Sequence, residues 1–303
     1  MTGRLLPFVS VIVPVLNGER TLRACLGSLL TLDYPVERRE ILVVDNGSTD
    51  RTAAIIQRLP VRYLREARRG AAAARNCGIA ASRGAILAFT DADCVVTTGW
   101  LRELVGGFED DSVGGVEGEI VAYPPVTPVQ RYAARIGSHS RRHRLTRVLP
   151  FFVLTANVAY RREVFQRIGL FDTRFSVAGE DADLSWRFFR ETDLECGYAC
   201  KAVVFHRHRA TLWGLFTQRI GDGYGRALLH RKYPRENPWD WRQEAQAYWR
   251  LLRALSRTTE LAFHRLFTDG EPAEIHDLFY DFIARLGYRI GFARGRLSGA
   301  SFR

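Results

Sequence analysis

The sequence predicts an α/β fold in which helices flank a mostly parallel sheet. Short runs of β-branched and aliphatic residues alternate with helical stretches through the first hundred residues, as in strand–helix–strand units of a parallel sheet. Beyond about Thr211 the pattern is helical. Of the 303 residues, 47% are hydrophobic and 25% are charged, which suits a packed globular chain. One sheet domain with a helical C-terminal extension is therefore expected.

The first third of the chain is expected to supply four strands and three helices. Phe8–Val15 is almost continuously aliphatic, which favours a strand buried on both faces. Arg20–Leu30 places four leucines on one side at helical spacing. The remaining expected elements are strands at Glu40–Val44, Val61–Leu64 and Ala85–Thr90, and helices through Ile55 and Ile56 and over Ala71–Ala81.

A strand is next expected over Val113–Tyr123, after which three prolines interrupt the pattern. Arg131–Arg147 is strongly basic, with six arginines and two histidines. The pattern then continues with the segment Leu154–Tyr160, a helix over Arg162–Ile168, a helix that begins at Glu180 and a last strand over Lys201–Phe205. These elements place a domain over residues 1–210 and an extension over residues 211–303.

The chain carries 44 Lys and Arg against 33 Asp and Glu, a formal net charge of +11. This excess suits an anionic partner, which could be a nucleotide, a phospholipid surface or nucleic acid. Composition does not choose among these partners, and a solvated basic surface is the simpler alternative. Because the chain has no recognisable nucleic-acid-binding motif, no nucleic-acid partner is expected.

Cysteine usage and apolar runs indicate a cytoplasmic protein. The five cysteines are odd in number and scattered, and Cys196 and Cys200 form neither a CxxC pair nor half of a recognisable zinc site. We expect all five to be reduced core residues. The N-terminus runs directly into a strand pattern, so no signal peptide is expected, and no apolar run reaches the roughly 20 residues of a spanning helix.

Polar residues follow three of the expected strands at their carboxyl ends. Asn17, Asp45 and Asp91 each lie at or just past such an end. Ligands of open α/β sheets bind in the crevice beyond the carboxyl ends of the strands. The three segments are therefore expected to converge on one ligand site.

The Asp91-Ala92-Asp93 motif at the last of these ends suggests a metal site. Two carboxylates separated by one residue can hold Mn²⁺ or Mg²⁺, which are bound by oxygen ligands together with substrate phosphates. A cation placed there would neutralise a diphosphate leaving group. Taken alone, the motif fits a polar turn better than a metal site.

Seven short fragments, in one order along the chain, favour the metal site over the polar turn. They are Ser10–Pro14 with Asn17, Val43–Asp50, Ala74–Ile79, Phe89–Asp93, Asn157–Arg162, Gly169–Asp172 and Gly179–Arg187. In these fragments the chain resembles the family 2 glycosyltransferases, which have the GT-A fold, over roughly Val9–His206. The resemblance implies a Rossmann-like catalytic domain over residues 1–210, with a nucleotide-binding half over about 1–96 and an acceptor-binding half over 97–210.

The resemblance also assigns donor-binding roles. Asp45 matches the carboxylate that accepts a hydrogen bond from the nucleotide base, and Pro14 and Asn17 match residues that line the nucleoside pocket. Arg75 is expected to approach the base or the phosphates. Asp91 matches the residue that contacts ribose and metal-bound water. Asp45 also suits a turn carboxylate, and both roles can hold together.

The same resemblance suggests the metal ligands and the general base. Asp93 matches the direct metal ligand, and His206 matches a histidine that completes the metal site in many relatives, with an ordinary surface or core histidine as the alternative. Asp181, in the pair Glu180-Asp181, matches the base that deprotonates the acceptor hydroxyl. Glu180 and Trp186 are expected to contact the acceptor. The alternative is that these carboxylates only favour a helix N-terminus.

These roles together predict an inverting glycosyltransferase, with a UDP-sugar as the first choice of donor and GDP- or dTDP-sugars left open. The acceptor hydroxyl would belong to a glycan or a lipid-linked precursor, as in cell-envelope polysaccharide synthesis. Transfer of a single sugar is expected, because Gln218 is not followed by the QxxRW pattern of processive members.

The sequence also leaves other interpretations of the basic stretch and of the function. Arg131–Arg147 could meet an acceptor diphosphate or the inner face of the plasma membrane as a peripheral contact, and a solvated helix is equally compatible. A dinucleotide oxidoreductase is disfavoured, because no GxGxxG follows the first strand. The main alternative is a non-catalytic protein that keeps the fold and binds nucleotide sugars or a membrane surface.

Overall fold

The computed structural model describes residues 6–137, 139, 151–236, 240–264 and 272–299. The chain divides into two compact units. The sheet unit comprises Met1–Tyr123, His139–Ser176 and Glu180–Arg207, and the helical unit comprises Pro124–Ser138, Val177–Gly179 and His208–Arg303. The basic residues 140–150 lie outside the described part of the chain.

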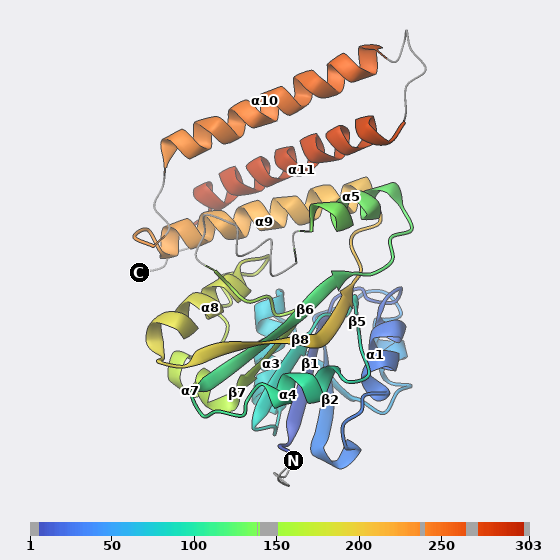
Figure 1. Cartoon of the computed structure of the whole chain (residues 1–303), viewed down its shortest axis with the longest axis vertical. Coiled ribbons are helices and arrows are strands. Elements are labelled where there is room, and N and C mark those ends of the chain that lie inside the picture. The colour runs from blue at the N-terminus through green and yellow to red at the C-terminus, as the bar shows by residue number, and fades with distance from the viewer. Residues whose placement is uncertain (1–5, 138, 140–150, 237–239, 265–271, 300–303) are drawn as a thin grey trace. The chain divides into compact units, whose positions relative to one another are not determined.

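Eight strands form the sheet of the sheet unit, in the order β3-β2-β1-β4-β7-β6-β8-β5 (Figure 1). Their bounds are β1 Val9–Val15, β2 Arg39–Asp45, β3 Arg62–Arg65, β4 Ile86–Thr90, β5 Cys94–Val96, β6 Val113–Ala122, β7 Asn157–Arg161 and β8 Glu195–His206. β1 runs parallel to both neighbours, β3 to β2, and β8 to β6, whereas β7 is antiparallel to β4 and β6, and β5 to β8. The predicted mostly parallel α/β fold is confirmed.

The helices that the sequence pattern predicts in the sheet unit are present, together with η1 and α4. In the sheet unit they are α1 Leu22–Leu30, the 3₁₀ turn η1 Val36–Arg38, α2 Thr52–Ile56, α3 Ala71–Ala81, α4 Trp100–Gly106, α7 Arg162–Ile168 and α8 Glu180–Glu191. The helical unit contains α5 Pro128–Ile136, α9 Leu212–Lys232, α10 Trp241–His264 and α11 Pro272–Leu297.

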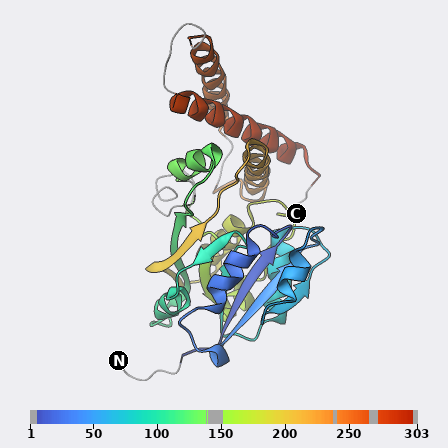
Figure 2. The same cartoon turned by 90° about the vertical axis from the view of Figure 1, so that its right-hand side faces the viewer.

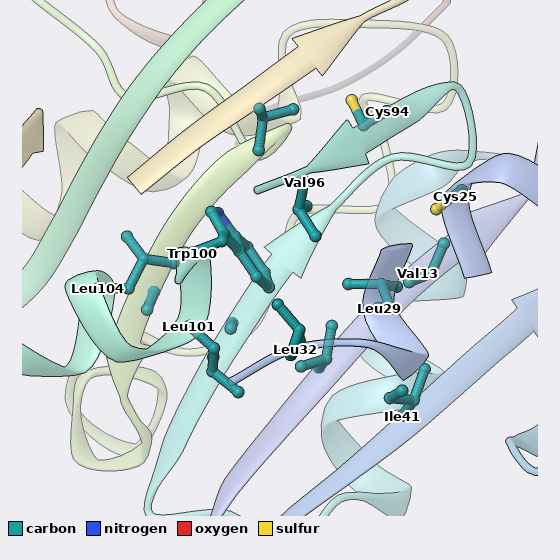
Figure 3. Close-up of a cluster of buried hydrophobic side chains, with 14 of the residues drawn as sticks. Val13, Cys25, Leu29, Leu32, Ile41, Cys94, Val96, Trp100, Leu101 and Leu104 are labelled. Carbon is teal, nitrogen blue, oxygen red and sulfur yellow. The ribbon is translucent and has the colours of Figure 1, made fainter. Parts of the chain in front are cut away.

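The core lies on both faces of the sheet, because successive side chains of a strand point to opposite sides. Val11 and Val13 of β1 belong to the cluster that includes side chains of α1 and α4. Ile12, between them, belongs to a second cluster with residues of α7 and α8. Figure 3 shows part of the first cluster, where Trp100, Leu101 and Leu104 of α4 lie near Leu29 and Leu32. A near-continuous aliphatic strand such as β1 is therefore needed at the centre.

The buried side chain of Asn157 joins three strands at the middle of the sheet. Its Nδ2 donates to the carbonyl oxygens of Glu119 and Ala202, each at 2.8 Å, and its Oδ1 accepts from Trp100 Nε1 at 2.7 Å. A Cβ at Gly118 would collide with Asn157 and with the Ala202 carbonyl. Glycine at that position therefore permits the close approach of β6, β7 and β8.

Several elements differ from the sequence-based expectation. β5 and α4 were not expected, and β8 begins at Glu195 rather than Lys201, because its first residues are partly exposed and lack a buried aliphatic run. α5 begins within the stretch that prolines were expected to interrupt. Thr127 and Gln130 form a capping box there, and Pro128 occupies the first turn, where its missing N–H costs nothing.

The prediction that the cysteines are reduced agrees with the structure, in which all five are free. The prediction that all are core residues is wrong. Only Cys25 and Cys94 are buried, whereas Cys77 and Cys196 are partly exposed and Cys200 is exposed. Cys200 lies on the partly exposed first part of β8, where alternate side chains face solvent.

In the helical unit, α11 packs against both α9 and α10. Glycines allow the close packing of α11 on α9, because a Cβ at Gly223 would collide with the Tyr288 backbone and one at Gly291 with the Ile220 backbone. The glycines of Gly221–Gly225 are thus packing residues in a helix. Within the described residues, no helix is both long and apolar enough to cross a membrane.

Candidate active site

The carboxyl ends of β1, β2 and β4 meet at one edge of the sheet, because these three strands are parallel neighbours with β1 in the middle. Asp45 is the last residue of β2, Asp91 directly follows β4, and Asn17 lies just past β1. The convergence expected from the sequence is therefore present in the fold.

Asn17 ties the loop after β1 to the loop after β2. Its backbone N–H donates to Ser48 Oγ at 2.9 Å, and its Oδ1 accepts from the Thr49 N–H at 2.8 Å. Asn17 has φ +53°, a left-handed conformation that asparagine tolerates better than most residues. The structure therefore places the Asn17 side chain in contact with the Asp45 loop.

Asp45 is buried and accepts two hydrogen bonds. Its Oδ1 accepts from the Ser48 N–H at 2.8 Å and its Oδ2 accepts from Tyr63 Oη at 3.2 Å. Burial, followed by the charge of Asp45, raises the pKa of Tyr63. The turn role expected for Asp45 is thus present, and a carboxylate has lone pairs left for a ligand.

Pro14 is buried within β1, one strand position before Val15. It pairs with Val44 of β2, and the pairing of β1 with β4 stops at Ile12. A proline is tolerated here because the strand has one neighbour fewer at this point. Pro14 therefore lies at the same end of the sheet as Asn17 and Asp45.

Arg75 links two acidic segments that are far apart in the sequence. Its side chain, on α3, is buried, with the residue 3% exposed. Nη2 donates to Asp91 Oδ1 at 2.9 Å, and Nη1 donates to Glu180 Oε1 at 2.7 Å. Within the described residues, Arg75 Nε has no hydrogen-bond partner. The guanidinium thus fixes the Asp91 loop relative to the start of α8.

Asp181 stands beside this network, at the N-terminal end of α8. Its Oδ1 accepts from the Ala182 N–H at 2.8 Å. Burial, followed by the negative charge of Glu180, raises the pKa of Asp181 to about 7, against the opposing charge of Arg75. A carboxyl with a pKa near neutrality can accept a proton at physiological pH, which is the property of a general base.

Asp183 and Trp186 of α8 have packing roles in the structure. Asp183 is fully buried and accepts from Arg187 Nε and Nη2, each at 3.0 Å. Trp186 is buried as well, at 4% exposed, which favours a place in the core over the expected acceptor contact. Glu180 forms an ion pair with Arg75, so the expected contact with the acceptor would have to be made alongside that ion pair.

Asp93 and His206 are brought together by strand pairing. β5 begins at Cys94 and runs antiparallel to β8, and Cys94 pairs with His206. As a result His206 Nε2 lies 3.5 Å from Asp93 Oδ1. The His139 ring lies 4.5 Å from the His206 ring, centroid to centroid. The register of these two strands accounts for the proximity of residues 113 positions apart.

The donor atoms of this corner fit a hard divalent cation. Asp93, Cys94 and His206 each place a donor atom within 4.8 Å of the others. The Cys94 sulfur is a soft donor, which suits Mn²⁺ or Mg²⁺ less well than oxygen ligands do. A carboxylate oxygen and an imidazole nitrogen remain, which is a donor set suited to Mn²⁺ or Mg²⁺ together with phosphate oxygens.

Three residues near the site were not singled out by the sequence analysis. They are Tyr63, which binds Asp45, His139, which lies beside His206, and Arg207. The Arg207 N–H donates to the Asp93 carbonyl at 2.9 Å, and its guanidinium lies 3.7 Å from the Tyr123 ring centroid. For these three residues, the sequence offered one signal, which is that Arg207 directly follows the candidate metal ligand His206.

A sequence-family model and curated proteins match the chain over the part that carries this site. The model, described as glycosyl transferase family 2, matches residues 10–169. Glycosyltransferase AglE from Haloferax volcanii is 34% identical over 229 residues, which cover 72% of this chain and 73% of that protein. The pre-mycofactocin glycosyltransferase from Mycobacterium tuberculosis is 32% identical over 235 residues, so the match covers 75% of this chain but about half, 48%, of that protein.

Solved structures share the fold at low sequence identity. A mannosyltransferase from Pyrobaculum calidifontis, in complex with GDP-Man and Mn²⁺, has a TM-score of 0.64 at 21% identity, with 98% of this chain and 89% of that chain covered. Residues 1–349 of TarS from S. aureus, in complex with UDP, have a TM-score of 0.51 at 17% identity, with 97% and 93% covered.

Proposed function

Because the chain belongs to glycosyl transferase family 2, we propose that it is an inverting glycosyltransferase that moves one sugar from a nucleoside diphosphate sugar to an acceptor hydroxyl. The observation that carries this proposal is the Arg75 network. It joins Asp91 of the Asp91-Ala92-Asp93 motif to Glu180, directly beside Asp181, at the edge where the parallel strands end. Sugar transfer needs residues that bind the donor and a base that deprotonates the acceptor. This arrangement brings Asp91, a candidate donor-binding residue, close to Asp181, the candidate base.

The nucleoside end of the donor would be bound by Asp45, with Pro14 and Asn17 beside it. Asp45 is held in place by Ser48 and Tyr63, so its remaining lone pairs have a fixed direction. UDP-sugars are our first choice of donor. Related folds bind UDP in one solved structure and GDP-Man in another, which keeps both nucleotides in the test.

Asp93 and His206 would hold Mn²⁺ or Mg²⁺, and Asp91 would contact the ribose. When bound, a divalent cation supplies positive charge against the diphosphate as it leaves. Arg75 would keep Asp91 oriented rather than reach the phosphates, because both of its terminal nitrogens are already engaged. Arg207 supports the Asp93 loop through its backbone N–H, while its guanidinium lies on the Tyr123 ring.

Asp181 would take the proton from the acceptor hydroxyl as the oxygen attacks the anomeric carbon. Direct displacement of this kind inverts the configuration at that carbon, which is why the proposal specifies inversion. We propose a glycan or a lipid-linked precursor as the acceptor, as in cell-envelope polysaccharide synthesis, with peripheral contact at a membrane surface.

Calorimetric titration of UDP and GDP, with and without Mn²⁺, tests the donor site. We expect one nucleotide to bind in the presence of Mn²⁺ and to bind much more weakly without it. Asp93→Ala should remove the metal dependence. The matched control is Asp111→Ala, which removes a carboxylate whose side chain is 91% exposed. If neither nucleotide binds under any condition, the proposal is wrong.

A further inference from the structure

One face of α10 carries large apolar side chains that the fold leaves in solvent. Trp241, Trp249 and Leu252 are 66%, 58% and 64% exposed, and Tyr248 and Leu255 are exposed as well. Positions 241, 248, 252 and 255 recur at seven-, four- and three-residue steps, which places them along one stripe of a helix, with position 249 at its border. Isolated exposed apolar residues are ordinary, but a stripe along one helix marks an interaction surface.

An adjoining side of α10 accounts for most of its packing within the helical unit. Ala254 is buried, and Glu244 forms an ion pair with Arg289 of α11 at 2.5 Å. α10 and α11 pack against each other, and Figures 1 and 2 both show them as neighbouring long helices. Of the stripe residues, Tyr248 also contacts α11, with its ring centroid 5.7 Å from the Arg289 guanidinium, whereas Trp241, Trp249 and Leu252 each stay more than half exposed.

Four exposed arginines border the stripe along one flank. They are Arg242, Arg250, Arg253 and Arg257. The Arg242 guanidinium lies 5.5 Å from the Trp241 ring centroid, and that of Arg253 lies 5.3 Å from the Trp249 ring centroid. Glu260 is the one exposed carboxylate among the described side chains of α10. The exposed face thus combines tryptophan and leucine with a strong excess of positive charge.

We propose that α10 is a membrane-binding helix that lies in the plane of an anionic lipid surface. Helices of this kind insert an apolar face at the boundary between headgroups and acyl chains, and their cations meet anionic headgroups. Tryptophan and tyrosine favour this boundary because their rings combine an apolar body with a polar edge. At 24 residues, α10 is about 36 Å long, which gives an extended contact parallel to the surface.

The arginines that border the stripe favour a lipid surface over a second copy of the chain as the partner of α10. If the stripes of two copies met, the arginines along each stripe would approach one another with one exposed carboxylate per helix to offset them. An anionic surface instead offers each arginine an opposite charge, and each cation near such a surface strengthens binding about fivefold. The four arginines therefore favour lipid as the occupant. This inference does not depend on the proposed transferase activity.

Co-sedimentation of the full-length protein with lipid vesicles tests the proposal, without donor or acceptor present. We expect binding to vesicles of phosphatidylcholine with phosphatidylglycerol and much weaker binding to phosphatidylcholine alone. Trp249→Ser with Leu252→Ser should weaken binding by about tenfold or more, because both side chains lose their apolar burial. The emission of wild-type tryptophan should shift to the blue on binding, and Trp241→Phe with Trp249→Phe should remove that shift.

A charge-matched pair of variants separates α10 from the net charge of the molecule. Arg250→Gln, Arg253→Gln and Arg257→Gln together should weaken binding by about a hundredfold. The control removes three exposed arginines of the sheet unit, as Arg23→Gln, Arg58→Gln and Arg167→Gln, and should change binding by no more than about twofold.

Three results would overturn the proposal. The first is the absence of wild-type binding to anionic vesicles. The second is an equal loss in both triple variants, which would assign binding to net charge. The third is a wild-type dimer in light scattering that becomes a monomer on Trp249→Ser with Leu252→Ser, which would make the stripe an interface between copies.

Discussion

The Asp181 carboxyl shows how one residue acquires its chemistry from its neighbours. Burial and the charge of Glu180 disfavour its ionised form, whereas Arg75 favours it, and the balance places its pKa at about 7. An exposed aspartate would be ionised at neutral pH but would be a weaker base. The position at the start of α8 therefore gives Asp181 a pKa that suits the proposed general base.

Asp181→Asn is expected to lower turnover by about 100- to 10,000-fold, because the amide cannot accept the acceptor proton. Donor affinity should be unchanged, since Asp181 is not among the donor-binding residues. Product formation and calorimetric titration measure the two quantities. Asp193→Asn, at an exposed position just after α8, is the control. Turnover retained in Asp181→Asn would exclude this residue as the base.

The raised pKa of Asp181 also predicts how stability depends on pH. The folded chain holds the Asp181 proton up to about pH 7, whereas the unfolded chain releases it near pH 4, so this group stabilises the fold at low pH. That contribution is lost as the pH rises through about 7. Asp181→Asn should therefore raise Tm relative to wild type more at about pH 8 than at about pH 5. Thermal unfolding of both proteins at the two pH values measures this, and an unchanged difference would contradict it.

Arg75 has a testable effect on the pKa of Asp181 as well as on stability. Arg75→Gln removes a positive charge, so the rising limb of the activity–pH profile should move to higher pH. It also leaves Asp91 and Glu180 without their partner, which should lower the free energy of unfolding by about 3–5 kcal/mol. Arg75→Lys keeps the charge and should leave the profile near its wild-type position while still lowering stability. If both variants shift the profile equally, charge is not the cause.

Among the elements, β7 determines how the two halves of the sheet are joined. It is antiparallel to both β4 and β6, so β6 and β8 run in the same direction as the strands that lead to Asp45 and Asp91. Asn157 at its start bonds to the backbone of β6 and β8 and to Trp100. β7 itself carries no proposed site residue. It positions the strands that lead to Asp91 and His206.

Asn157→Ala is expected to lower the free energy of unfolding by about 2–5 kcal/mol, because it leaves two buried carbonyls and the Trp100 N–H without their partner. Chemical denaturation measures the change. Glu195→Ala, at an exposed position on β8, is the control and should stay within about 0.5 kcal/mol of wild type. A similar stability for both variants would show that the Asn157 hydrogen bonds contribute little.

At the scale of the whole molecule, stability comes from two compact units without disulfides. Cys25 and Cys94 lie in the same apolar cluster (Figure 3), and burial raises the pKa of both thiols, which keeps them unreactive. The five cysteines contribute to packing or lie at the surface.

Reductant is therefore expected to leave Tm unchanged. A disulfide contributes about 2–4 kcal/mol, so its reduction would lower Tm by about 5 °C or more. Differential scanning calorimetry with and without dithiothreitol measures the difference. A marked fall of Tm in dithiothreitol would contradict the assignment of five free thiols.

The sequence by itself determined the order and type of most elements. Aliphatic runs and helical spacing act between near neighbours in the chain, so β1, α3 and α7 are found within a residue or two of their expected bounds. Local patterns also indicated which polar residues end the parallel strands, and hence where a ligand site would form. The short β5 and the helix α5 were missed because three residues carry little pattern and prolines masked a capping box.

Only the tertiary structure decided which of these residues contact one another. Arg75 and Glu180 are 105 positions apart, and their ion pair depends on the packing of α3 and α8 rather than on any local pattern. The proximity of Asp93 and His206 depends on the register of β5 and β8. Whether Trp186 is buried or Trp249 exposed also depends on packing. Local sequence sets what a residue can do, whereas partners and burial come from segments distant in the chain, and these set its charge, pKa and accessibility.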